Sequence, residues 1–173
     1  MKILIFSQLP MTKNIYNEYV EVTSDLDITL KKCFMNHLVI YNHSLGLLYN
    51  NSELNFKSLM KSVSNYITKK SINPILQLPL MSELYYQYKK FKRNIRIQKL
   101  VTDIQYFTFL CNGYECKSLL FNKEKDRIQI QGFIGEIKLP KPLPSIPIEQ
   151  SIYLNISYSN IEDKYKLSVY KAN

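Results

Sequence analysis

The sequence predicts an α+β protein in which a small, mainly antiparallel, β-barrel-like lobe is interrupted by a three-helix insertion. Apolar residues recur at spacings of three and four between residues 24 and 100, which is typical of amphipathic helices. After residue 104 the chain changes to short β-rich runs separated by turn residues. The N-terminal strand region cannot form a sheet alone, so we expect it to pair with the C-terminal strands.

Strand structure is predicted near the N-terminus, at 2–6 and 13–22. The second run fits a strand with one local irregularity, because its bulky residues do not alternate perfectly. These residues are Ile15, Tyr16, Tyr19, Val20 and Val22.

Three helices are expected next, over 23–51, over 55–70 and from 79 to about 100. Ser24 is the predicted N-cap of the first helix, with Asp27 three residues later as a weak capping box. Each helix has one apolar face at helical spacing. The three faces contain Leu30, Phe34, Leu38, Tyr41, Leu45 and Leu48; Phe56, Leu59, Met60, Val63 and Ile67; and Leu80, Leu84, Tyr88, Phe91 and Ile95.

Five β-rich runs follow, at 104–113, 114–122, 127–140, 150–159 and 164–172. Turn residues separate them, including Asn-Gly at 112–113, a polar run at 122–126 and another at 160–164. We therefore expect one continuous unit with two lobes. The β-lobe would contain 1–23 and 104–173, and the helical lobe 24–103.

The chain is strongly basic. Lys and Arg number 23 against 14 Asp and Glu, which gives a formal net charge of +9 and a pI near 9.3. Such a charge favours a polyanionic partner. Two alternatives remain open: the charge could serve solubility alone, or the lysine excess could follow from AT-rich codon usage. No apolar run approaches the roughly 18 residues of a membrane span, so we expect no membrane partner.

The three cysteines, Cys33, Cys111 and Cys116, are odd in number, and no secretory signal is seen. These features predict free thiols and a cytoplasmic location. Cys111 and Cys116 could supply half of a zinc site, but zinc sites normally use tighter paired motifs. His37 and His43 lie six residues apart and cannot share a helical face. We therefore predict neither a metal nor another cofactor.

No catalytic pattern emerges from the sequence. Asp25 and Asp27 lie at a helix start, where carboxylates complement the helix dipole. The nucleophile motif G-x-S-x-G is missing, and Gly132 and Gly135 lack the Lys-Ser/Thr pair of a phosphate loop. The prediction is that the protein is not an enzyme.

The segment 85–99 combines six basic residues with aromatic ones and contains no acid. On a helix, its apolar residues would face inward and its cations outward, toward a phosphate backbone. A solvated helix face is the alternative, although such faces usually mix charges of both signs. The candidate phosphate contacts are Lys89, Lys90, Lys92, Arg93, Arg96 and Lys99, with Tyr85 as a candidate stacking residue and Lys69, Lys70, Lys138 and Lys141 as outer candidates.

Three stretches resemble the N-terminal part of TnpB, the transposon-encoded RNA-guided nucleases related to type V CRISPR effectors. They are the helix around Tyr41-Asn42, the aromatic and basic helix end near Phe91, and the run from 127 to 171. The matching positions in the last stretch are Gly135, Ile137, Lys138, Tyr165 and Ser168. The resemblance implies a wedge-like β-barrel interrupted by a recognition lobe that grips guide RNA, without the nuclease half.

Charge and resemblance together predict a non-catalytic nucleic-acid-binding module, of transposon or phage relation, with RNA favoured over DNA. The alternative is a viral or mobile-element protein-interaction module, an adaptor or inhibitor that binds a host protein such as a nuclease.

Overall fold

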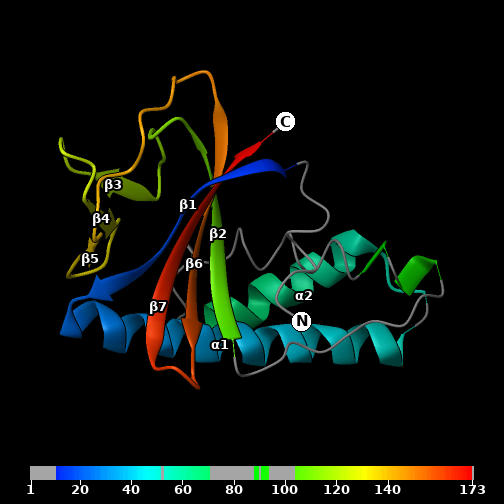
Figure 1. The fold of residues 1–173 in the computed structure, drawn as a ribbon. Coiled ribbons are helices and arrows are strands. Elements are labelled where there is room, and N and C mark those ends of the chain that lie inside the picture. Colours follow the sequence, from blue (N-terminus) through cyan, green and yellow to red (C-terminus); the bar gives the residue numbers. More distant parts are fainter. Residues whose placement is uncertain (1–10, 52, 71–87, 90, 94–103, 173) are drawn as a thin grey trace. The chain divides into compact units, whose positions relative to one another are not determined.

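The computed structural model describes residues 11–51, 53–70, 88–89, 91–93 and 104–172 (Figure 1). The chain divides into two compact units, which we call the helical unit, within Lys32–Thr102, and the β unit, formed by Phe6–Lys31 and Asp103–Asn173. The boundary falls inside the first helix, so Ser24–Lys31 belongs to the β unit. The sequence-based division had placed that whole helix in the helical lobe.

Seven antiparallel strands form one curled sheet in the β unit (Figure 1). Its spatial order is β2-β6-β7-β1-β5-β4-β3. The strands are β1 (Met11–Val22), β2 (Ile104–Asn112), β3 (Leu119–Phe121), β4 (Arg127–Ile130), β5 (Ile137–Lys138), β6 (Ser151–Ser159) and β7 (Lys164–Ala172). The predicted α+β class and the barrel-like β-lobe are therefore confirmed.

Strand β1 joins the C-terminal strands, as predicted: it pairs with β7 along most of its length and with β5 at its end. Its register with β7 shifts between Asn14 and Tyr16, where the Asn14 side chain accepts a hydrogen bond from the Tyr16 N–H at 3.1 Å. This bulge is the predicted irregularity, and it turns the Tyr16 ring into the core.

Two of the predicted strands are shorter than the sequence indicated. The run at 114–122 contains only β3, because two tight turns, closed by the bridges Asn112↔Glu115 and Cys116↔Leu119, come before it. The run at 127–140 divides into β4 and β5, since Gly132 and Gly135 adopt φ values of 83° and 100° between them.

The sheet core consists of alternate residues from the strands. Phe107, Leu154, Ile156, Leu167 and Val169 are all fully buried. From the helix, Leu26 and Leu30 are buried in the same unit. Burial of this apolar surface is the main stabilising contribution to the β unit.

Helix α1 (Ser24–Asn50) begins at Ser24 itself, one residue earlier than a cap at Ser24 predicts. The Thr23 carbonyl accepts the first helical hydrogen bond from the Asp27 N–H at 2.8 Å, so Thr23, not Ser24, occupies the N-cap position. The Asp27 carboxylate accepts a hydrogen bond from the Tyr165 hydroxyl at 2.9 Å and pairs with Lys31 at 3.1 Å. The carboxylate that the sequence assigned to capping thus interacts with Tyr165 of β7 and with Lys31 of its own helix.

Helix α2 (Phe56–Lys69) has the predicted amphipathic pattern. The Asn55 side chain caps it by accepting a hydrogen bond from the Ser58 N–H at 2.9 Å. The predicted strand at 2–6 and most of the predicted third helix lie outside the described residues. Of that third helix, residues 88, 89, 91 and 92 are helical.

Candidate nucleic-acid interface

The helical unit has its own apolar core, which fixes which side chains face outward. Buried residues of α1 and α2 form it: Ile40, Tyr41, Leu45, Leu48, Leu59, Val63 and Ile67. Tyr88 and Phe91 pack against this cluster, as the sequence predicted, and the Tyr88 ring lies 5.4 Å from the Phe56 ring. The segment around residue 90 is therefore anchored to the same core as α2.

The polar face of α2 is basic. Lys57, Lys61, Lys69 and Lys70 are all exposed. Lys57 and Lys61 lie four residues apart, on one side of the helix, where like charges repel and weaken the helix by a few tenths of a kcal/mol. Within the described part of the chain, no ion pair involves any of these four lysines. A bound polyanion would relieve their repulsion.

Further cations come from the segment anchored by Tyr88 and Phe91. Lys89, Lys92 and Arg93 are exposed, and the Lys92 ammonium lies 5.6 Å from the Tyr88 ring centroid and 5.7 Å from that of Phe91. The Arg93 N–H donates to the Lys89 carbonyl at 3.2 Å, which continues the helical turn. Of the other candidates in this segment, Tyr85, Lys90, Arg96 and Lys99 lie outside the described residues.

An aromatic stack lies beside Lys70, at the end of α2. The His43 ring of α1 and the Tyr66 ring of α2 are stacked, with centroids 4.5 Å apart and an interplanar angle of 20°. The Lys70 ammonium lies 5.9 Å from the Tyr66 centroid. His43 is exposed and Tyr66 half-buried, and aromatic rings beside a cation are residue types that single-stranded nucleic-acid sites use.

The charge of the chain is concentrated in this part of the sequence. Residues 32–102 contain eleven Lys and Arg but only two acids, Glu53 and Glu83. The rest of the chain contains twelve of each sign, so the full net charge of +9 belongs to residues 32–102. The ion pairs found among the described residues all lie in the β unit.

The outer candidates Lys138 and Lys141 belong to the β unit, not to the helical unit that contains the other candidates. Lys138 is exposed on β5 and lines a depression of about 600 Å³ together with Tyr19, Arg127 and Lys164. Lys141 forms an ion pair with Glu18, and its carbonyl accepts a hydrogen bond from the Tyr16 hydroxyl at 3.0 Å. A structural role already accounts for Lys141.

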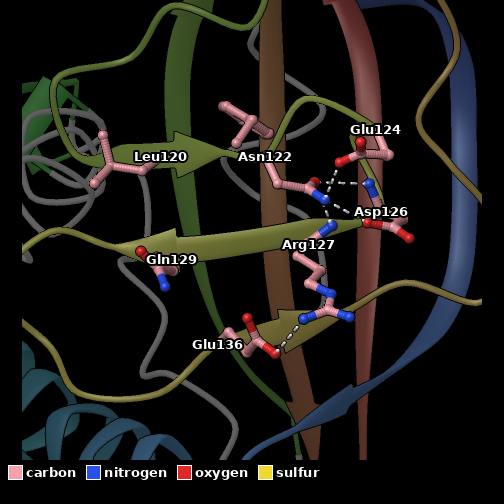
Figure 2. A pocket seen from close by; sticks show the side chains of 8 residues that line it. Leu120, Asn122, Glu124, Asp126, Arg127, Gln129 and Glu136 are labelled. Carbon is pink, nitrogen blue, oxygen red and sulfur yellow. Dashed lines mark hydrogen bonds and ion pairs between the residues drawn. The ribbon is translucent and has the colours of Figure 1, made fainter.

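Figure 2 shows a second depression of the β unit, with a volume of about 470 Å³, next to the turn between β3 and β4. The Asn122 side-chain oxygen accepts hydrogen bonds from the N–H groups of Asp126 and Arg127 at 3.0 and 2.9 Å. Its amide nitrogen therefore faces the carboxylates of Glu124 and Asp126, to which it donates at 3.1 and 2.6 Å. These hydrogen bonds stabilise the turn between β3 and β4.

Sequence reasoning missed Lys57, Lys61 and the His43–Tyr66 stack. The two lysines could have been found, because both fall on the polar side of the predicted second helix. The stack could not, since it depends on how α1 and α2 pack.

No cluster of three or more metal-ligating side chains is present among the described residues. Neither α1 nor α2 is long and apolar enough to cross a membrane. Comparison with known protein families and with curated proteins gives no match.

Proposed function

We propose that this chain is a non-catalytic nucleic-acid-binding module of the cytoplasm, that it prefers RNA to duplex DNA, and that it works without a cofactor. The observation that carries the proposal is the concentration of the entire net charge in residues 32–102, with the described cations on the outside of a single helical core.

Exposed lysines and arginines in a region with eleven cations and two acids favour binding to the phosphates of a nucleic acid. Contacts of this type give affinity and salt dependence but little sequence information. The His43–Tyr66 stack favours a single-stranded ligand, because the bases of a duplex are already stacked on each other. The resemblance to the guide-RNA-gripping half of TnpB also favours RNA.

The first test is to purify the protein without nuclease treatment and to measure its ultraviolet absorbance ratio. We expect co-purifying RNA that raised salt releases and that sequencing then identifies. Protein that is free of nucleic acid, and that also fails to bind RNA or DNA at low salt, would contradict the proposal. Binding to a host protein that does not change with salt would instead support an adaptor or inhibitor.

Matched lysine variants test where the RNA binds. The triple variant Lys61→Gln, Lys69→Gln and Lys70→Gln removes cations from the proposed interface. Its control, Lys13→Gln, Lys117→Gln and Lys123→Gln, removes the same charge from exposed sites of the β unit. Glutamine is as good a helix former as lysine, so α2 should persist.

For the interface triple we expect RNA affinity at least tenfold lower. In a plot of log K for RNA binding against log salt concentration, the slope should become less steep by about 2, because each of the three lost phosphate contacts contributes about 0.7. The control should keep both values near those of the wild type. Equal losses in the two triples would show that only net charge matters and would refute the assigned surface.

A further inference from the structure

The turn that follows β2 brings two cysteines together. The N–H of Asn112 donates to the Glu115 carbonyl at 3.1 Å, and the N–H of Glu115 donates to the Asn112 carbonyl at 2.9 Å. Exchange of both hydrogen bonds closes a two-residue hairpin turn, in which Gly113 adopts a φ of 55°. In an antiparallel hairpin the next position places Cys111 opposite Cys116, which is also where the chain enters the second turn, closed by the bridge Cys116↔Leu119.

Cys111 and Cys116 therefore occupy a cross-strand position without mutual backbone hydrogen bonds. Facing residues at such positions lie closest, with Cα atoms roughly 4.5 Å apart and side chains on the same face. A disulfide needs Cα atoms about 4.4–6.8 Å apart, so the hairpin can accept one without being rebuilt. The Cys116 thiol donates a weak hydrogen bond to the Leu110 carbonyl at 3.9 Å, so its sulfur lies beside the strand that carries Cys111.

The two thiols differ in their surroundings. Cys111 is 2% exposed, whereas Cys116 is only half-buried. The hydrogen bond from Cys111, assisted by the N–H groups of Ser118 and Leu119, lowers the pKa of the Cys116 thiol to about 6. The same hydrogen bond, together with burial, raises the pKa of Cys111. Cys116 is therefore the thiol of the pair that ionises more easily and that a reagent can reach, while Cys111 is buried.

We propose that Cys111 and Cys116 form a thiol-modification site, at which a low-molecular-weight disulfide of the glutathione class converts them reversibly into an intramolecular disulfide. The Cys116 thiolate attacks one sulfur of the disulfide and releases the first thiolate. Cys111 then gives up its proton and attacks the Cys116 sulfur of the mixed disulfide, which releases the second thiolate. Two protein thiols are oxidised, and one small disulfide is reduced to two thiols.

The site lies where the hairpin contacts the proline-rich loop. The Gly113 N–H donates to the Gln150 carbonyl at 2.8 Å, and the Tyr114 hydroxyl donates to the Pro144 carbonyl. Oxidation would link Cys111, at the end of β2, covalently to Cys116, which follows the hairpin turn. The site is independent of the proposed nucleic-acid interface, because it lies in the β unit.

The test uses reduced, folded protein and dithiobis(nitrobenzoate), a chromogenic disulfide. We expect the wild type to release two thiolates per chain and to keep no adduct, with peptide mapping showing a Cys111–Cys116 disulfide. Cys111→Ser should release one thiolate and keep a stable mixed disulfide on Cys116. Cys116→Ser should react only when unfolded. The matched control, Cys33→Ser, should behave as the wild type, because Cys33 is buried and its pKa is raised to about 11.

Peptide mapping of the wild type decides the question even if a variant fails to fold. A stable adduct on Cys116 beside a reduced Cys111 would overturn the proposal, as would reaction of Cys33 at the same rate as Cys116. The rate of the first release should also rise through about pH 6. A rise only near pH 8 to 9, as for an ordinary thiol, would refute the role of Cys116.

Discussion

Asp163 shows how single residues fasten the start of α1 to the β6–β7 hairpin. It adopts a φ of 48°, a conformation in which Asp and Asn are common among non-glycine residues. Its carboxylate accepts a hydrogen bond from the Tyr158 hydroxyl at 2.6 Å and lies 3.5 Å from the Lys31 ammonium. These two contacts, the Tyr158 hydrogen bond first, lower the pKa of Asp163 below its ordinary value of 3.8.

This lowered pKa predicts a pH-dependent contribution to stability. A carboxyl group whose pKa is lower in the folded state stabilises the fold at pH values above its unfolded pKa, and this contribution disappears as the pH falls through the folded pKa. Asp163→Asn keeps the backbone preference and the hydrogen-bond acceptor but removes the charge. We expect its urea midpoint to be slightly lower than that of the wild type at pH 7, since the group is exposed. The difference should vanish near pH 2, and a difference that stays constant with pH would exclude the electrostatic origin.

At the scale of elements, the turn between β4 and β5 sets how closely the sheet approaches the first turn of α1. The Thr23 N–H donates to the Glu136 carbonyl at 3.1 Å, and the Glu136 N–H donates to the Thr23 hydroxyl oxygen at 3.0 Å. A Cβ on Gly135 would lie 2.2 Å from that oxygen and 2.9 Å from the Leu26 Cβ. A Cβ on Gly132, which also has positive φ, would meet nothing within 4 Å.

The two glycines therefore provide a matched pair. Gly132→Ala should cost only the backbone strain of positive φ, about 1 kcal/mol. Gly135→Ala adds steric overlap with α1, which typically costs a further 1–3 kcal/mol. Chemical denaturation of both variants measures the difference. Equal destabilisation would mean that the helix start moves aside at little cost.

Much of this architecture could be predicted from the chain, and the exceptions have physical causes. Periodicity located β1, α1 and α2, because one side of each is less exposed than the other along the element. It failed for β3 and for the division of β4 from β5, since those segments are controlled by single turns. Gly135 and Tyr165, which the sequence analysis singled out, have structural roles: Gly135 allows a close approach to α1, and the Tyr165 hydroxyl donates a hydrogen bond to Asp27. The basic segment could be recognised from the sequence as a charged surface. The His43–Tyr66 stack could not, because it depends on how α1 and α2 pack.

At the scale of the whole molecule, two cores rather than one stabilise the chain. Leu59 is fully buried in the helical unit, within a cluster drawn only from that unit, and Leu167 is fully buried in the β unit. Units with separate cores can open separately, with different free energies. Because each unit contains a fully buried leucine, the same truncation can be made in both and its effects on the two units compared.

Truncation of either leucine to alanine removes the same atoms and should cost about 2–5 kcal/mol. In Leu59→Ala we expect faster hydrogen exchange of the α2 amides, while β6 and β7 keep their protection. Leu167→Ala should show the reverse pattern, and hydrogen exchange followed by mass spectrometry resolves the two units. Equal loss of protection in both units, in either variant, would show that the chain unfolds as one cooperative body. Separate opening would instead allow the basic helical unit to reorganise around RNA while the β unit, which has a formal charge of −1 and carries the cysteine pair, stays folded.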